Sequence, residues 1–298
     1  MMTRMPELTR RAVLRLGVGM AAGALGAQTL GPVLDSRPAP AAPVVMAATH
    51  VPLAPAAPPA PTAPTMATGS FVSAARGGVV TNWAIARPPG QTNALRPVIT
   101  LHGKGSDAAS VMAGGVEHGL AQAVAAGLPP FAVVAVDGGG SYWHKRASGE
   151  DSGAMVLQEL IPLLGTQGLD TSRVAFLGWS MGGYGALLLG SRLGPDRTAA
   201  ICAVSPALWL SPGAAAPGAF DGPDDWAANS VFGLPALASI PIRVDCGIGD
   251  PFYAATRQFV AQLPHPPAGG FSPGGHDAAF WSAQLPAELT WLAPLLTA

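Results

Sequence analysis

Charged side chains are scarce in this sequence of 298 residues, because aspartate, glutamate, lysine and arginine together make up only 11% of it. The 16 basic and 17 acidic residues leave a formal net charge of −1, and lysine occurs only at Lys104 and Lys145. Without a basic excess, the chain has no electrostatic attraction to nucleic acid or to an anionic membrane surface. We therefore expect neither as a partner, whereas 49% hydrophobic residues are ample for a sizeable core.

A strongly hydrophobic run is missing from the N-terminus, where a membrane anchor would require one. An arginine pair, Arg10 and Arg11, precedes residues 16–34, which are rich in glycine and alanine and only weakly hydrophobic. This arrangement resembles a twin-arginine export signal. We assign residues 1–36 to such a signal and expect the protein in the periplasm, the cell envelope or the medium. We expect no integral membrane span in the mature form; an uncleaved anchor is the alternative.

Cysteine is nearly absent, and its two occurrences, Cys202 and Cys246, lie in segments that we predict to be strands. Export would permit a disulfide between them. Two buried free thiols are about equally compatible with the sequence, because a bridge between neighbouring parallel strands demands unusual geometry. The sequence shows no cluster with the spacing of metal ligands, so we expect no metal and no cofactor.

Residues 37–68 consist largely of proline and alanine and are almost free of charge. Such a stretch cannot form a periodic apolar face, so we predict a semi-extended linker. The folded domain is then expected over residues 69–298, which is the length of one domain.

Short apolar runs alternate with longer helical patterns through this domain. Each run is almost continuously hydrophobic, as in strands that are buried on both faces of a parallel sheet. A hairpin near residues 71–86 would add antiparallel strands at one edge. The pattern predicts an α/β protein with a mostly parallel central sheet flanked by helices, whose ligands bind beyond the carboxyl ends of the strands. The expected strands are 98–101, 132–136, 174–177, 199–204 and 240–246, and the expected helices are 107–126, 152–166, 182–193, 254–263 and 278–296.

A serine between two glycines, in Gly178-Trp179-Ser180-Met181-Gly182, joins a predicted strand to a predicted helix. Side chains two positions before and after the serine would collide in so tight a turn, so the glycines match a nucleophile elbow. The helix N-terminus also directs backbone N–H groups at this point. We predict that Ser180 is the nucleophile and that the N–H of Met181 stabilises an oxyanion. A purely structural glycine turn is the alternative.

The segment His102-Gly103-Lys104-Gly105 follows the predicted strand 98–101 and has the His-Gly form of many esterase oxyanion loops. We predict the backbone N–H of Lys104 as the second oxyanion donor, with that of Gly105 as the next choice. His102 would then shape the loop and not act as the base. A simple turn is the alternative.

A general base and an acid must come from elsewhere in the chain. We favour His276, which lies in a glycine-rich loop before the last predicted helix, over His144 as the base. The reason is that α/β-hydrolases order their catalytic residues as serine, acid, histidine. By the same order Asp250, which follows the predicted strand 240–246 through a glycine turn, is the acid that would orient the imidazole. Asp245 is its rival, but a position within the strand favours packing or a hydrogen bond.

Five spaced motifs connect these candidates: LHGKGSD, VDGGGSYWH, GWSMGGYGALLL, CGIGDPF and GGHDAAFW. Together they resemble the α/β-hydrolase esterases of the esterase D type, a group that includes the secreted actinobacterial mycolyltransferases. The resemblance covers about residues 70–298 and implies an α/β-hydrolase fold with Ser180, Asp250 and His276 as the triad. It departs from those mycolyltransferases in two places, since their first oxyanion loop reads Asp-Gly-Leu and their acid is a glutamate. Both differences weaken a prediction of mycolyl transfer and leave the prediction of an esterase intact.

Residues 205–233 form a short, lid-like insertion between two predicted strands. The insertion contains Trp209 and Trp226, while Trp143, Trp179 and Trp281 lie in or beside the motifs. These five tryptophans would suit a cleft for an acyl group. Packing of the insertion onto the core explains them equally well.

We therefore predict an exported serine hydrolase that cleaves a small-molecule or lipid carboxylic ester through an acyl-enzyme. One alternative is an acyltransferase that passes the acyl group to a sugar or cell-envelope hydroxyl. Another is a non-catalytic cell-envelope binding protein on a hydrolase scaffold, which an incomplete set of catalytic residues would have favoured.

Overall fold

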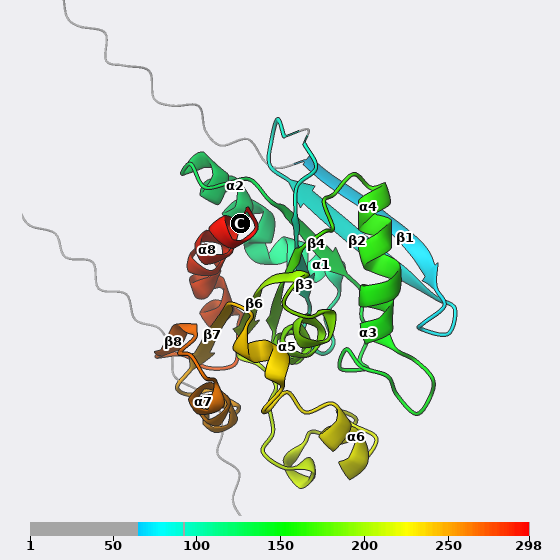
Figure 1. Cartoon of the computed structure of the whole chain (residues 1–298), viewed down its shortest axis with the longest axis vertical. Helices are drawn as coiled ribbons and strands as arrows, with labels where there is room; N and C mark the ends of the chain where they lie inside the picture. Colours follow the sequence, from blue (N-terminus) through cyan, green and yellow to red (C-terminus); the bar gives the residue numbers. More distant parts are fainter. Residues whose placement is uncertain (1–64, 92, 298) are drawn as a thin grey trace, which may run out of the picture. The chain divides into compact units, whose positions relative to one another are not determined.

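The computed structural model of the protein describes residues 65–91 and 93–297, so the expected export signal and nearly all of the expected linker lie outside the described residues. Eight strands form one sheet in the order β1-β2-β4-β3-β5-β6-β7-β8 (Figure 1). β1 and β2 form an antiparallel hairpin, β2 is antiparallel to β4, and every pair from β4 to β8 is parallel. The expected α/β architecture with a mostly parallel sheet is confirmed. The strands are β1 (Thr65–Ser73), β2 (Val79–Arg87), β3 (Pro97–Leu101), β4 (Ala132–Val136), β5 (Val174–Trp179), β6 (Thr198–Val204), β7 (Ile242–Gly247) and β8 (Ala268–Ser272).

The five predicted helices are present, and two of them contain a π-helical segment. In the first, Gly115 has φ 97°, a conformation that glycine adopts without strain, and the regular helix is interrupted there. Its pieces are α1 (Ala108–Val111), η1 (Met112–Val116) and α2 (Glu117–Ala125). The second consists of α3 (Ser152–Ala154), η2 (Met155–Leu160) and α4 (Ile161–Thr166), and the others are α5 (Met181–Leu193), α7 (Tyr253–Gln262) and α8 (Ala278–Leu295).

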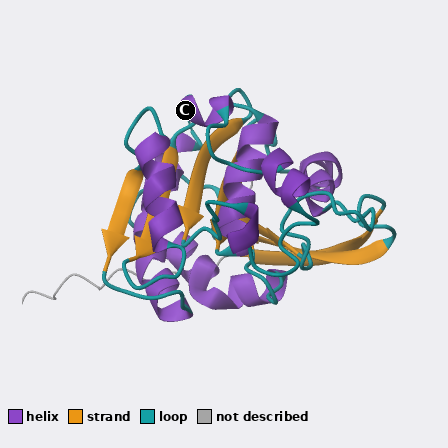
Figure 2. Ribbon diagram, turned by 90° about the horizontal axis from the view of Figure 1, so that it is seen from below, coloured by secondary structure: helices purple, strands orange, loops and turns teal. Residues whose placement is uncertain are grey.

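Helices cover both faces of the sheet (Figure 2), and the inner strands alternate between two hydrophobic cores. In β4, Ala132, Val134 and Val136 belong to one core, while Val133 and Ala135 belong to the other. The first core also contains side chains of η2, α4, α5 and α7, and the second contains side chains of α1, η1, α2 and α8. Because both faces are covered, these strands consist largely of hydrophobic residues, and β4 is hydrophobic at every position.

One strand, one α-helix and two short 3₁₀ segments, the second of which is η4 (Pro235–Ala238), were not predicted. β8 reads Ala-Gly-Gly-Phe-Ser and lies partly exposed at the edge of the sheet beside β7, so it has no continuous apolar run. α6 (Pro223–Ala228) is a short helix within the insertion, which also carries the 3₁₀ segment η3 (Pro212–Ala214). At the other end of the domain, β1 begins at Thr65, four residues before the expected domain start at residue 69.

The two cysteines are separate, buried free thiols. Cys202 lies in β6 and Cys246 in β7, and the strand register pairs Cys202 with Arg243 instead. Of the two possibilities left open by the sequence, the structure shows the one without a disulfide. Among the described helices, none has the length and apolar character needed to cross a membrane.

Candidate active site

Ser180 lies at the sharp turn between β5 and α5, with φ 57° and ψ −117°. These angles are strained for a residue that has a side chain. A Cβ on Gly178 would overlap the carbonyl of Gly182, and a Cβ on Gly182 would overlap the carbonyl of Leu101. Both glycines are therefore required for the backbone to pass through this turn, as a nucleophile elbow demands.

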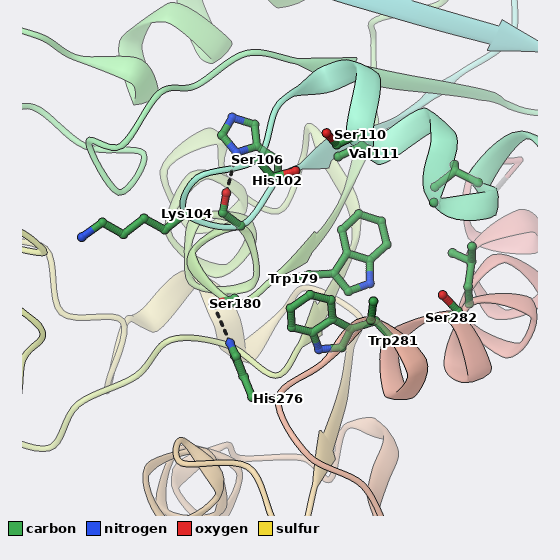
Figure 3. Close-up of a pocket in the computed structure, with 15 residues that line it drawn as sticks. His102, Lys104, Ser106, Ser110, Val111, Trp179, Ser180, His276, Trp281 and Ser282 are labelled. Atoms are coloured by element: carbon green, nitrogen blue, oxygen red, sulfur yellow. Dashed lines mark hydrogen bonds between the residues drawn. The ribbon is translucent and has the colours of Figure 1, made fainter. Parts of the chain in front are cut away.

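A chain of hydrogen-bonded side chains leads from Ser180 to a buried carboxylate. His276 Nε2 lies 2.9 Å from Ser180 Oγ, and His276 Nδ1 lies 2.8 Å from Asp250 Oδ2. Figure 3 shows the Ser180–His276 bond as a dashed line. Asp250 follows β7 and His276 follows β8, so the three residues meet at the carboxyl ends of the strands. Ligands of open α/β sheets bind in this position.

The carboxyl group of Asp250 is held in its charged form. Burial acts to raise its pKa, but the hydrogen bond from His276 and the one from the Phe252 N–H outweigh this effect and lower the pKa below its ordinary value. Two aromatic rings also contact the imidazole edge-on, with centroid distances of 5.1 Å to Phe252 and 5.2 Å to Trp281. The ring of His276 is thus oriented by a carboxylate on one nitrogen and by aromatic neighbours on its sides.

The residue after His276, Asp277, has a structural role. Asp277 is the N-cap of α8, and its carboxylate accepts a 2.9 Å hydrogen bond from the N–H of Phe280. The cap fixes where α8 begins, directly after the imidazole.

The loop after β3 lies against the elbow. A Cβ on Gly103 would lie 3.6 Å from the Cβ of Ser180. The buried ring of His102 holds this loop, because its Nε2 accepts a 2.9 Å hydrogen bond from the Gly138 N–H and its Nδ1 lies 2.7 Å from the Gly103 carbonyl oxygen. Since Nε2 accepts, Nδ1 carries the proton and donates it to that carbonyl. Burial lowers the pKa of His102, in agreement with a neutral ring.

The backbone amides expected as oxyanion donors flank Ser180 on two sides. Met181 is the first residue of α5, where the N–H groups of a helix lack intrahelical acceptors. Lys104 follows Gly103 in the loop that lies against the elbow, and within residues 65–91 and 93–297 its N–H donates to no backbone carbonyl. Among the described residues neither amide has a backbone acceptor, so the prediction that both stabilise an oxyanion is compatible with this loop and helix.

The rival residues His144 and Asp245 have other partners. The ring nitrogens of His144, a fully buried side chain, lie 3.0 Å from the Lys145 carbonyl and 3.1 Å from the Ala219 carbonyl. Asp245, within β7, forms an ion pair with Arg243 at 2.6 Å. The structure brings neither of them to Ser180.

A cavity of about 390 Å³ opens beside Ser180 and His276. Of the five tryptophans expected to line a cleft, Trp179 and Trp281 do so. Trp143 is completely buried and contacts the His102 ring. Trp209 and Trp226 border a separate void of only about 10 Å³ in the insertion, which is the packing role that the sequence left open.

Trp281 reaches the cavity from the first turn of α8, where the GGHDAAFW motif places it close to His276.

One cluster of possible metal ligands exists among the described residues. Ligand atoms of Cys202, Asp245 and Glu288 lie within 4.8 Å of one another. Arg243 already binds both oxygens of Asp245, and burial raises the pKa of the Cys202 thiol and of the Glu288 carboxyl well above their ordinary values. Metal ligands must be deprotonated, and a guanidinium beside them repels a cation, so the cluster is poorly suited to a metal.

A model of the family described as "Putative esterase" matches residues 81–292 of this sequence. No match was found among curated proteins. Three similar solved structures are a ferulic acid esterase, an S-formylglutathione hydrolase from Agrobacterium tumefaciens and the fluorophosphonate-binding serine hydrolase F of Staphylococcus aureus in a substrate-bound form.

These structures share the fold of the chain at low sequence identity. The ferulic acid esterase is 21% identical, with a TM-score of 0.64, over 78% of this chain and 98% of its own. The S-formylglutathione hydrolase is 19% identical, with a TM-score of 0.65, over 78% and 95%. The serine hydrolase F is 18% identical, with a TM-score of 0.61, over 78% and 99%.

Proposed function

This chain belongs to the esterase family, in its esterase D-like group of α/β-hydrolases, and we propose that Ser180, His276 and Asp250 are the catalytic triad with which it hydrolyses carboxylic esters. The hydrogen-bonded sequence Ser180 Oγ, His276 Nε2, His276 Nδ1, Asp250 Oδ2 supports the proposal most directly. A serine is a weak nucleophile on its own, and a base within hydrogen-bond distance is what activates it.

In the proposed reaction, His276 Nε2 takes the proton of Ser180 as Oγ bonds to the ester carbonyl carbon. The carbonyl oxygen becomes an oxyanion, which accepts hydrogen bonds from the N–H groups of Met181 and Lys104. The C–O bond to the alcohol then breaks, and His276 gives its proton to the leaving oxygen. Asp250 stabilises the imidazolium that exists between these two proton transfers.

Water completes the cycle. His276 removes a proton from a water molecule as its oxygen attacks the acyl-enzyme carbonyl, and the second tetrahedral intermediate releases the carboxylic acid and restores Ser180. An alcohol that took the place of water would make the same site an acyltransferase.

Labelling with a fluorophosphonate, followed by assay of p-nitrophenyl esters with and without a sugar acceptor, tests this proposal. We expect stoichiometric labelling and ester turnover that both vanish in Ser180→Ala. Turnover should also vanish in His276→Ala but persist in a folded His144→Ala variant. An unlabelled protein without esterase activity would refute the proposal. Ester turnover that occurs only when the sugar is present, and that yields acylated sugar, would make the protein a transferase.

We also propose that the chain is exported through its arginine pair, Arg10 and Arg11, which lies outside the described residues. Fractionation of cells that express the full chain should place the protein outside the cytoplasm. A variant that carries both Arg10→Lys and Arg11→Lys should accumulate inside; export that is unaffected by the double substitution would exclude this route.

A further inference from the structure

We infer that the cavity beside Ser180 is the acyl pocket, that it takes an uncharged, apolar acyl group considerably longer than acetyl, and that Gly114 sets its length. This inference rests on the proposed role of Ser180 as the nucleophile. It adds a substrate class and a residue that determines specificity.

The walls of the cavity are mostly apolar. They come from the loop after β3, from α1 and η1, from the end of β5 and from the first two turns of α8. Figure 3 shows Trp179 and Trp281 beside Ser180, with Val111 and the hydroxyls of Ser110 and Ser282 on the same side. No aspartate, glutamate or arginine of the described residues borders the cavity. An acyl group that bears a charge would lose its hydration there without gaining a partner.

The one lysine at the cavity points elsewhere. In Figure 3 the side chain of Lys104 extends away from Trp179 and Trp281. Its Nζ lies 3.4 Å from the Pro217 carbonyl of the insertion and 5.6 Å from the centroid of the Tyr142 ring. The two sides of Ser180 therefore differ, with an apolar cavity on one side and a polar, cationic approach on the other.

This asymmetry indicates which side of Ser180 holds the acyl group of the ester and which side holds the alcohol. The alcohol must take a proton from His276 and depart into water while the acyl group stays on Ser180. The polar side suits the departing alcohol, whereas the apolar cavity suits the group that stays. Burial of each further acyl methylene is worth about 0.8 kcal/mol, which corresponds to about a fourfold gain in kcat/KM.

Gly114 is placed to limit how long the acyl group can be. It borders the cavity from η1, and a Cβ built on it meets no atom within 4 Å. A larger side chain can therefore project from this position without displacing the backbone. The neighbouring Gly115, with φ 97°, interrupts the helix and keeps this stretch of η1 free of side chains over two successive residues.

The experiment compares kcat/KM for p-nitrophenyl acetate, butyrate, hexanoate and octanoate, together with acetate esters of alcohols of increasing length. For the wild-type protein we expect kcat/KM to rise by about fourfold per acyl methylene until the cavity is full, and to depend little on alcohol length. Gly114→Leu should lower the octanoate-to-acetate ratio at least tenfold. The matched control is Gly213→Leu in η3, another glycine whose Cβ would meet nothing within 4 Å, and it should leave the ratio as in the wild type.

Two results would overturn the inference. One is a wild-type protein that prefers the acetate ester, together with a Gly114→Leu variant that has the wild-type Tm and the same preference. The other is a dependence on alcohol length in place of acyl length, which would make the cavity an alcohol site. Fluorophosphonate labelling distinguishes failure of this inference from failure of the proposed function. If the protein is labelled and active but its kcat/KM does not depend on acyl length, the triad stands and only the acyl-pocket inference is wrong.

Discussion

At the scale of single residues, Ser180 combines a strained backbone with a position between two required glycines. Its φ of 57° and ψ of −117° are imposed by β5 and α5, which meet at this residue. Strain of this kind persists only where the surrounding structure enforces it, and it is common at functional sites. Here it directs the hydroxyl of Ser180 out of the turn and toward the imidazole of His276.

The strain can be measured by comparing two inactive variants. Ser180→Ala and Ser180→Gly should both lower kcat by about 10⁴-fold or more, since each lacks the nucleophile. Glycine adopts these angles freely, so Ser180→Gly should escape about 1 kcal/mol of strain and unfold at a Tm roughly 2–4 °C above that of Ser180→Ala. Thermal unfolding followed by circular dichroism checks this. Equal Tm values would contradict this prediction, since relief of strain would then not exceed the entropy that glycine adds to the unfolded chain.

His102 should make the stability of the protein sensitive to acid. Burial lowers its pKa from 6.5 in the folded state, so the unfolded chain takes up this proton at a higher pH than the folded protein does. The contribution of the neutral ring to the free energy of unfolding is therefore complete above pH 6.5, and it is lost as the pH falls below that value. We expect His102→Gln to weaken the decrease in unfolding free energy between pH 7 and pH 5, as measured by urea denaturation.

The matched control for this experiment is His118→Gln, on the exposed side of α2. This substitution should leave the wild-type pH dependence intact. If His102→Gln and His118→Gln gave the same profile as the wild type, proton uptake at His102 would not contribute to acid sensitivity.

At the scale of elements, α8 connects the candidate site to the core. Its N-cap, Asp277, follows His276, and Trp281 in its first turn contacts the imidazole and the cavity.

Farther along α8, Glu288 is fully buried, and its carboxylate oxygens have no hydrogen-bond partner among the described residues. Burial, with a smaller effect of Asp245, raises the pKa of Glu288 well above its ordinary value.

Glu288 should therefore lower the free energy of unfolding as the pH rises. The folded protein keeps a proton on Glu288 that the unfolded chain releases near pH 4.5, so the contribution of this residue is complete below pH 4.5 and declines above it. Glu288→Gln, which cannot ionise, should be more stable than the wild type at pH 8, and the advantage should shrink toward pH 5. Urea denaturation across this range checks the prediction, with Glu117→Gln in α2 as the control. A constant difference at all pH values would contradict it.

At the scale of the whole molecule, the described residues form one sheet with a hydrophobic core on each face. The family match, residues 81–292, includes every candidate catalytic residue. The hairpin of β1 and β2 joins the same sheet through β4.

We therefore expect a chain that begins at residue 57, where the second compact unit starts, to fold in a single cooperative transition. Its Tm and its kcat/KM for p-nitrophenyl esters should equal those of the full-length protein. Calorimetry and kinetics on the two chains provide the comparison. A lower Tm or a second transition would show that residues 1–56 stabilise the domain.

Much of the fold could be predicted because its signals are local. Strands covered on both faces are hydrophobic at nearly every position, so the runs at 98–101, 132–136 and 174–177 identified β3, β4 and β5. The partly exposed edge strand β8 lacks this pattern and was missed. The elbow could also be predicted, because the need for Gly178 and Gly182 arises from atoms only a few residues away or in the adjoining strand.

The sequence alone therefore determined the class of fold, the position of the elbow and the small set of residues able to serve it. Only the tertiary structure decided that His276, and not the fully buried His144, lies 2.9 Å from Ser180, and that Trp179 and Trp281 border the cavity while Trp143 and Trp209 do not. The physical reason is distance along the chain. Backbone conformation follows from neighbouring residues, whereas the cavity exists because η1 and α8, more than 160 residues apart, pack against the same face of the sheet.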